Sequence, residues 1–273
     1  MYLPLTLDIV AAKVLDTASS TNDVVIGRGA EALHFDTVLT TTQTSGRGRL
    51  GRSWSAPPST SLAVSVMIRP RGLHGAPVDM QTWGWLPLLA GLAMSRAVTA
   101  LLPGRPVGLK WPNDVLVGSK KVSGILSELV PDASGVVVGA GLNLSIAESD
   151  LPTALATSLT LEGCELRDDA LVDAACSSYL TQFRSLVDTF LAADGDTETT
   201  GLRTATHRAC TTIGRSVRVQ LPTRPDLIGV AQTLDSLGRL VVRATDGSTH
   251  PIAAGDVTHL RPIDIIGDGD QPR

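Results

Sequence analysis

The sequence is poor in cysteine and in aromatic residues, and it has no long apolar run. Its three cysteines, Cys164, Cys176 and Cys210, are odd in number and widely spaced, which argues against a disulfide framework and against a zinc site. No stretch reaches the roughly 20 consecutive apolar residues of a membrane span. The N-terminal stretch "MYLPLTLDIVAAKVLD" lacks the basic-then-apolar layout of a signal peptide. We therefore expect a cytoplasmic protein with no membrane partner.

A positive charge balance is also absent. The 273 residues carry a formal net charge of -4 at pH 7 and give a pI of about 5.7. This balance argues against a nucleic-acid binder that relies on a broad basic face. With 43% hydrophobic and 18% charged residues, the chain can bury a normal core and is not a disordered polyelectrolyte.

Lysine is scarce, with four residues against 19 arginines. Three of the four, Lys110, Lys120 and Lys121, fall within twelve residues of each other. A chain that otherwise uses arginine can keep lysine where a compact point charge is needed. Chance clustering is the alternative interpretation.

The apolar patterns predict an α+β protein with two folded parts. Residues 1–210 alternate strand-like and helix-like patterns, whereas residues 211–263 show only short strands separated by turns, as in a small barrel. Residues 264–273 are expected to be disordered. Ser20 and Asp23 fit a capping box that opens a short helix. The expected strands are 13–17, 35–42, 61–69, 107–111, 115–117, 120–130 and 135–145, with a hairpin turn at 118–119, and the long helices are 79–102 and 168–192.

The stretch "QTSGRGRLGRSW", residues 43–54, gathers positive charge without any acidic residue. Its glycines let backbone N–H groups turn toward an anion, and Arg47, Arg49 and Arg52 supply forked donors for a carboxylate or phosphate. The stretch ends in Trp54, a large apolar anchor. A solvated charged turn is the alternative.

A second polar stretch is "KWPNDV", residues 110–115. Asn113 and Asp114 could present oxygens to a hydrated magnesium ion, and Lys110 could meet a phosphate. The alternative is an ordinary Pro-Asn-Asp turn between strands. On the returning strand, Lys120 and Lys121 point to opposite faces, so at most one of them faces the same cleft as Asp114.

Two further stretches could line a binding site. In "SSTND", a helix N-terminus with Ser20, Thr21 and Asn22 offers donors to an anion or a carbonyl, although simple capping would explain the same residues. In "GAGLN", residues 139–143, a ligand could pack against bare strand backbone. Close packing inside a buried strand is the alternative there. The five histidines stand in no motif.

Taken together and in this order, "SSTN", "QTSGRGRLGRSW", "KWPNDV" with "KVSGIL", and "GAGLNL" resemble the biotin protein ligases. The match spans Thr17 to about Ser145, and the β-rich end is similar to the small SH3-like C-terminal domain of that family. The resemblance implies a mixed-sheet catalytic domain flanked by helices. It also implies ATP-dependent biotinylation of a carrier lysine through biotinyl-5'-AMP, with pyrophosphate and then AMP released. ATP and biotin would be the substrates, with Mg²⁺.

The resemblance also implies roles for individual residues. Lys121, Arg49 and Asp114 would serve catalysis, and Asp114 or a nearby group could remove the proton of the acceptor lysine. Asn113 and Asp114 would hold Mg²⁺. The biotin-binding residues would be Ser20, Thr21, Asn22, Gln43, Gly46, Arg47, Gly48, Lys121, Gly124 and Gly141, and the ATP- or adenylate-binding residues would be Arg47, Arg49, Arg52, Trp54, Lys110, Trp111, Asn113 and Asn143.

The implied partner is a biotin carboxyl carrier protein, or the carrier domain of an acyl-CoA or pyruvate carboxylase. The biotin motif begins at Ser20, which leaves no room before it for the winged helix-turn-helix of some family members. We therefore expect no DNA-binding repressor function, and a monomer or a weak homodimer. Three alternatives stay open: a lipoate- or octanoate-transferring relative, a sensor that binds the adenylate without catalysis, and an adaptor built on the β-rich end.

Overall fold

A seven-stranded mixed sheet forms the body of the protein. The computed structural model describes residues 1–221, 224–253 and 255–259. The two outermost strands on one side, β1 and β2, run parallel, and every other neighbouring pair in this sheet is antiparallel. Each strand coincides with one expected from the sequence, and the mixed sheet is confirmed. The order is β1 (Ala12–Leu15), β2 (Thr37–Thr40), β5 (Ser61–Ile68), β9 (Val136–Asn143), β8 (Lys120–Leu129), β7 (Asp114–Val117) and β6 (Val107–Lys110).

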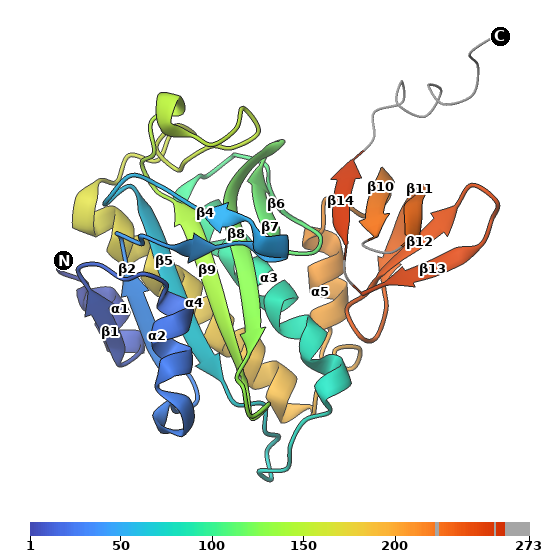
Figure 1. The fold of residues 1–273 in the computed structure, drawn as a ribbon, viewed down its shortest axis with the longest axis horizontal. Coiled ribbons are helices and arrows are strands. Elements are labelled where there is room, and N and C mark those ends of the chain that lie inside the picture. The colour runs from blue at the N-terminus through green and yellow to red at the C-terminus, as the bar shows by residue number, and fades with distance from the viewer. Residues whose placement is uncertain (222–223, 254, 260–273) are drawn as a thin grey trace.

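Helices cover both faces of this sheet (Figure 1). The long helices α3 (Trp85–Leu101) and α4 (Asp168–Ala192) lie against one face and pack on each other, and α1 (Pro4–Ile9) packs on α4. The opposite face carries α2 (Thr21–Gly27), whose Val25 packs with Met67 and Val137. The expected helix 79–102 is confirmed, except that its first turn, Met80–Gly84, is a 3-10 helix. Shorter 3-10 turns span Gly29–Glu31 and Glu148–Asp150.

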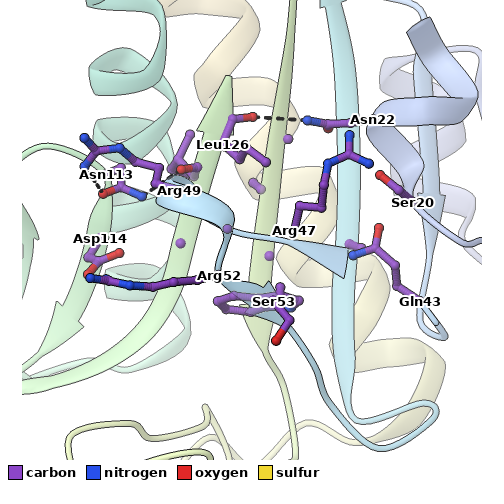
Figure 2. A pocket seen from close by; sticks show the side chains of 18 of the residues that line it. Ser20, Asn22, Gln43, Arg47, Arg49, Arg52, Ser53, Asn113, Asp114 and Leu126 are labelled. Carbon is purple, nitrogen blue, oxygen red and sulfur yellow. Dashed lines mark hydrogen bonds between the residues drawn. The ribbon is translucent and has the colours of Figure 1, made fainter. Parts of the chain in front are cut away.

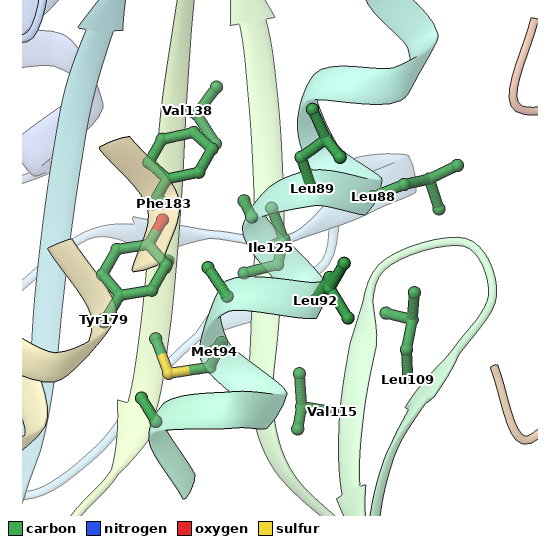
Figure 3. Close-up of a cluster of buried hydrophobic side chains, with 14 of the residues drawn as sticks. Leu88, Leu89, Leu92, Met94, Leu109, Val115, Ile125, Val138, Tyr179 and Phe183 are labelled. Atoms are coloured by element: carbon green, nitrogen blue, oxygen red, sulfur yellow. The ribbon is translucent and has the colours of Figure 1, made fainter. Parts of the chain in front are cut away.

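The main core fills the space between the sheet and the two long helices. Figure 3 shows α3 side chains such as Leu89 and Leu92 over the sheet, with the Tyr179 and Phe183 rings of α4 beside α3. Among the described residues, one helical stretch, Met80–Leu101, is long and apolar enough to cross a bilayer on length and composition alone. Its most apolar window is 67% buried inside this core, so its apolar surface is already used in packing.

The C-terminal part is a five-stranded antiparallel sheet, as the short-strand pattern predicted (Figure 1). Helix α5 (Leu202–Ala209) precedes it. The order is β13 (Thr249–Ile252), β12 (Leu240–Ala244), β11 (Arg224–Leu234), β10 (Ser216–Leu221) and β14 (Asp256–His259). The expected disordered tail, 264–273, lies outside the described residues.

Two tryptophans of the first part bind one turn of the second. The Trp85 indole N–H donates to the Ser236 carbonyl at 2.8 Å, and the Trp111 indole N–H donates to the Gly238 carbonyl at 3.2 Å. Both indoles are buried. The turn between β11 and β12 is itself held by Asp235, whose carboxylate accepts from two backbone N–H groups. The two parts are therefore joined by buried, directional contacts.

The Gly/Arg stretch is a short ribbon laid across the sheet (Figure 1). Strands β3 (Gly46–Arg47) and β4 (Ser53–Trp54) pair antiparallel, and a 3-10 turn, Arg49–Gly51, closes the ribbon. The ribbon lies on the same face of the sheet as α2, opposite α3 and α4. It thereby covers the central strands β9 and β8 and encloses a cavity above them.

Candidate functional site

The cavity under the ribbon is where the sequence-predicted residues meet. It is bounded by the N-terminus of α2, the ribbon, the end of β7, the strands β8 and β9, and Asp256 of β14. Figure 2 shows side chains from these separate segments facing one another. Its lining includes Ser20, Thr21, Asn22, Gln43, Arg47, Gly48, Arg49, Arg52, Trp54, Asn113, Asp114, Lys121, Gly124 and Gly141 from the predicted set.

The floor of the cavity is bare backbone, because glycines alternate along the strands beneath it. A Cβ placed on Gly141 would lie 2.5 Å from Trp54 Cε2, and one on Gly124 would lie 3.1 Å from Lys121 Nζ. A Cβ on Gly139 would collide with the Asn22 carboxamide. The glycines are therefore needed for close approach by the side chains above. The Trp54 indole lies over Gly141, on the strand backbone against which the sequence predicted that a ligand would pack.

The N-terminus of α2 forms a polar corner. Ser20 caps the helix as predicted, with its Oγ accepting from the Asp23 N–H at 3.4 Å. The Thr21 backbone N–H donates to Gln43 Oε1 at 2.9 Å. The Ser65 hydroxyl of β5 lies 2.7 Å from Thr21 Oγ1 and 2.6 Å from Asn22 Oδ1. Donors and acceptors thus alternate here around a buried space, which suits a neutral polar group.

Arg47 bridges this corner to β8. Its guanidinium donates two hydrogen bonds of 2.6 Å to the Asp23 carboxylate and also binds both Glu128 oxygens at 3.0 Å. The bond from Arg47 holds the pKa of Asp23 below its ordinary value, and the same pairing, opposed by burial, raises the pKa of Arg47. The Asp23 carboxylate therefore serves the ribbon arginine, in addition to the backbone cap formed by Ser20.

Asn113 and Asp114 of the KWPND turn lie at the opposite end of the cavity, together with the ribbon arginines Arg49 and Arg52 (Figure 2). Arg49 donates to Asn113 Oδ1 at 3.2 Å and to the Gly255 carbonyl at 3.4 Å. Arg52 forms an ion pair with Asp256. The Lys121 ammonium lies 2.6 Å from Asp114 Oδ1 and 5.7 Å from the centre of the Trp54 ring.

Lys110 lies beside this end, half-buried at the close of β6. Burial lowers its pKa, and the charges of Lys121 and Arg52 lower it further, while Asp114 opposes the shift. Arg49 is half-buried as well, and burial likewise lowers its pKa. Such crowding of cations is costly without an anion between them. Lys120 is exposed and Lys121 lines the cavity with Asp114, so the expectation that at most one of the two lysines faces this cleft is confirmed.

Four predicted residues do not line the cavity. Gly46 is packed between the Gln43 side chain and Trp54, and Lys110 lies behind the lining. Trp111 is 2% exposed and lines a neighbouring cavity between the two sheets, where Arg49 and Gly238 also lie. Asn143 is buried, and its Nδ2 donates to the Thr157 carbonyl at 2.8 Å. The role of Gly46 in binding biotin, and the roles of the other three in binding ATP or adenylate, stay predictions.

Two functional candidates were missed. Glu128 could have been found by strand alternation, because residues 124, 126 and 128 share one face of β8. Asp256 pairs with Arg52 across 204 residues of sequence, and no local pattern signals that contact.

The arrangement offers little to a metal ion by itself. Among the described residues, no group of three or more His, Cys, Asp or Glu side chains could hold one. Asp114 is paired with Lys121, and Asn113 Oδ1 faces Arg49. One carboxylate and one amide oxygen fit Mg²⁺ only where phosphates supply most of its ligands, which is how proteins commonly bind it.

Comparisons with known proteins identify the family and the fold. A model of the biotin/lipoate A/B protein ligase family matches residues 16–143, and one of the biotin protein ligase C-terminal domain matches residues 212–260. A biotin–[acetyl-CoA-carboxylase] ligase of Mycobacterium tuberculosis is 37% identical over 264 residues, covering 93% of this chain and 89% of that protein. The bifunctional ligase/repressor BirA of Escherichia coli is 27% identical, covering 92% and 75%. The fold is similar to that of an Aquifex aeolicus biotin protein ligase solved with biotin and ATP, at a TM-score of 0.72 and 24% identity over 92% and 98% of the two chains.

Proposed function

The chain belongs to the biotin protein ligase family, and we propose that it joins biotin to a lysine of a carrier protein in two ATP-dependent steps. In the first step, the biotin carboxylate attacks the α-phosphorus of ATP, and pyrophosphate leaves. In the second, the ε-amine of the carrier lysine attacks the carbonyl of biotinyl-5'-AMP, and AMP leaves. The acceptor is the biotin carboxyl carrier domain of an acyl-CoA or pyruvate carboxylase.

The observation that carries this proposal is the separation of charge along the cavity. At the α2 corner, Arg47 is surrounded by Asp23 and Glu128, which gives a local charge of -1. At the other end, three cations of the lining and a fourth just behind it stand against two carboxylates, which gives +2. These groups are Arg49, Arg52, Lys110 and Lys121 against Asp114 and Asp256. A ligand with a neutral polar head and an anionic tail would therefore bind in one direction, with its tail at the cationic end.

The first step needs two anions to approach each other. Lys121 is the cation best placed to bind the biotin carboxylate, since it lies over the glycine floor between the corner and Asp114. Arg49, Arg52 and Lys110 would bind phosphate oxygens and stabilise the charge that develops on them. Mg²⁺ would arrive with ATP, would offset phosphate charge, and would be held by phosphate oxygens with Asn113 and Asp114.

The second step needs a protected anhydride and a neutral lysine. The ribbon covers the cavity and would keep water from the adenylate until the carrier arrives. Asp114 is the carboxylate within reach of Lys121, and it is our candidate for accepting the proton of the attacking amine. The ribbon is rich in glycine so that it can move and rich in arginine so that phosphates draw it closed.

A radiolabel transfer assay tests this function. Purified protein is mixed with biotin, MgATP and a carrier-domain acceptor, and both adenylate and labelled acceptor are followed. We expect transfer that requires ATP and Mg²⁺. Adenylate without transfer to any carrier would favour the sensor, and labelling by lipoate in place of biotin would favour the lipoate-transferring relative.

A further inference from the structure

Glu128 connects the ribbon to the polar corner of the cavity. It lies on β8, on the same strand face as Gly124 and Leu126, with its side chain 28% exposed. Its two oxygens accept from Arg47 on the ribbon, and one also accepts from Asn22 Nδ2 at 2.6 Å. A single carboxylate thus binds two elements that are 25 residues apart, β3 and α2.

The Asn22 carboxamide is fully used by its neighbours. Its Nδ2 donates to Glu128 and to the Leu126 carbonyl, the latter at 3.4 Å, while its Oδ1 lies 2.6 Å from the Ser65 hydroxyl. These partners fix which end of the amide is nitrogen, because two acceptors lie on one side and a hydroxyl on the other. No amide proton of Asn22 is left to bind a ligand. Asn22 is 5% exposed and lies directly above Gly139.

Resting on the function proposed above, we propose that Glu128 is a positioning residue that couples closure of the ribbon to the biotin-binding corner. Through Asn22 and Ser65 it orders the Thr21 hydroxyl, and through Arg47 it holds the ribbon over that corner. The Asp23 carboxylate binds Arg47 from the other side, and it is not among the hydrogen-bond partners of the Asn22 side chain in the described part of the chain. Loss of Glu128 therefore disturbs the corner and the ribbon together, whereas loss of Asp23 disturbs the ribbon alone.

The two carboxylates make a matched pair of variants. Glu128→Gln keeps the shape of the side chain and one acceptor oxygen, but it loses the charge that Arg47 and Asn22 share. Asp23→Asn loses the charge on the other side of Arg47. Glu198→Gln is the control, because Glu198 pairs with Arg203 on the surface at 2.5 Å and lies outside the cavity lining.

The experiment measures biotin binding without ATP by calorimetry, then the Michaelis constants for biotin and ATP, then the rate of adenylate release. For Glu128→Gln we expect the biotin dissociation constant and the KM for biotin to rise roughly tenfold, as for loss of a charged hydrogen bond. We expect its KM for ATP to stay within about twofold, and its adenylate to be released faster. Asp23→Asn should release adenylate faster with biotin affinity near wild type, and Glu198→Gln should match wild type in all three.

Two results would overturn the inference while leaving the ligase function intact. One is wild-type biotin affinity in Glu128→Gln. The other is an equal loss of biotin affinity in Asp23→Asn, which would assign the whole effect to Arg47. Should Glu128→Gln fail to fold, Glu128→Asp replaces it, because aspartate keeps the charge but holds it one methylene further back. The KM for biotin must then rise in Glu128→Asp, by less than the roughly tenfold expected for Glu128→Gln. A wild-type protein that neither binds biotin nor transfers it would instead refute the proposed function.

Discussion

Alanine at position 141 should drive the Trp54 indole off the floor of the cavity. The new methyl group would lie 2.5, 2.7 and 2.9 Å from Trp54 Cε2, Cζ2 and Nε1. Favourable contact between carbon atoms begins near ~3.5 Å, so the indole must retreat by about 1 Å. The strand cannot move instead, because Gly141 pairs with Ala63 of β5 on one side and Gly124 of β8 on the other.

The cost should be that of overpacking a well-filled site, about 1–3 kcal/mol in the free energy of unfolding. We expect the lower end of this range, since Trp54 sits on a two-residue strand that can shift. A double-mutant cycle isolates the contact: Gly141→Ala is made in the wild-type chain and in a Trp54→Ala chain, and both are unfolded in urea. Without the indole, the alanine should cost less than about 0.5 kcal/mol. An equal cost in the two backgrounds would refute the reasoning.

Three further predictions concern individual side chains. Lys121→Ala should lower adenylate formation roughly a hundredfold, the size of a lost transition-state donor, whereas Lys120→Ala, on the exposed side of the strand, should not; single-turnover assays would compare them. Arg49→Gly should still form adenylate but release it about tenfold faster in a filter-binding assay, because its bonds to Asn113 and the Gly255 carbonyl anchor the ribbon turn, and a wild-type lifetime would contradict this. Burial, with the nearby charges of Lys110 and Arg215, lowers the pKa of His259 to about 4. Between pH ~6.5 and about 4, His259 is therefore protonated in the unfolded chain but neutral in the folded protein. Stability should therefore fall as the pH drops from about 6.5 toward 4, and less so in His259→Gln, as urea unfolding at several pH values would measure.

Local patterns predicted most of the elements and the segments that form the site. Runs of β-branched residues marked the strands, and the spacing of glycines and arginines marked the ribbon as a site for anions. The ribbon strands escaped notice because two residues are too few for a periodic signal. Helix α1 was not predicted either, because it is only six residues long. Its backbone N–H groups at Leu5 and Thr6 are capped by the carboxylate of Asp173, which is far away in sequence.

Contacts between segments that are distant in the sequence could not be predicted from local patterns. Asp23 fitted a helix cap, but its carboxylate binds Arg47, and nothing in the "SSTND" stretch indicates that choice. Trp111 stood beside the polar PND turn, yet its indole is buried against the C-terminal sheet. In both cases the order of strands in the sheet decides the neighbour, and that order is set by packing of the whole chain.

The indole bonds from Trp85 and Trp111 to one turn of the C-terminal sheet bear on how the protein can be dissected. A fragment that ends at residue 210, before Thr212 and β10, would leave two large aromatic surfaces facing water, each of the order of 150–250 Å². It would also lose the Thr212 hydroxyl that binds the Trp111 backbone N–H, next to the KWPND turn. Inactivity of such a fragment would thus report damage to the cationic end of the cavity, and it could not be taken as a sign that the small sheet recognises the carrier.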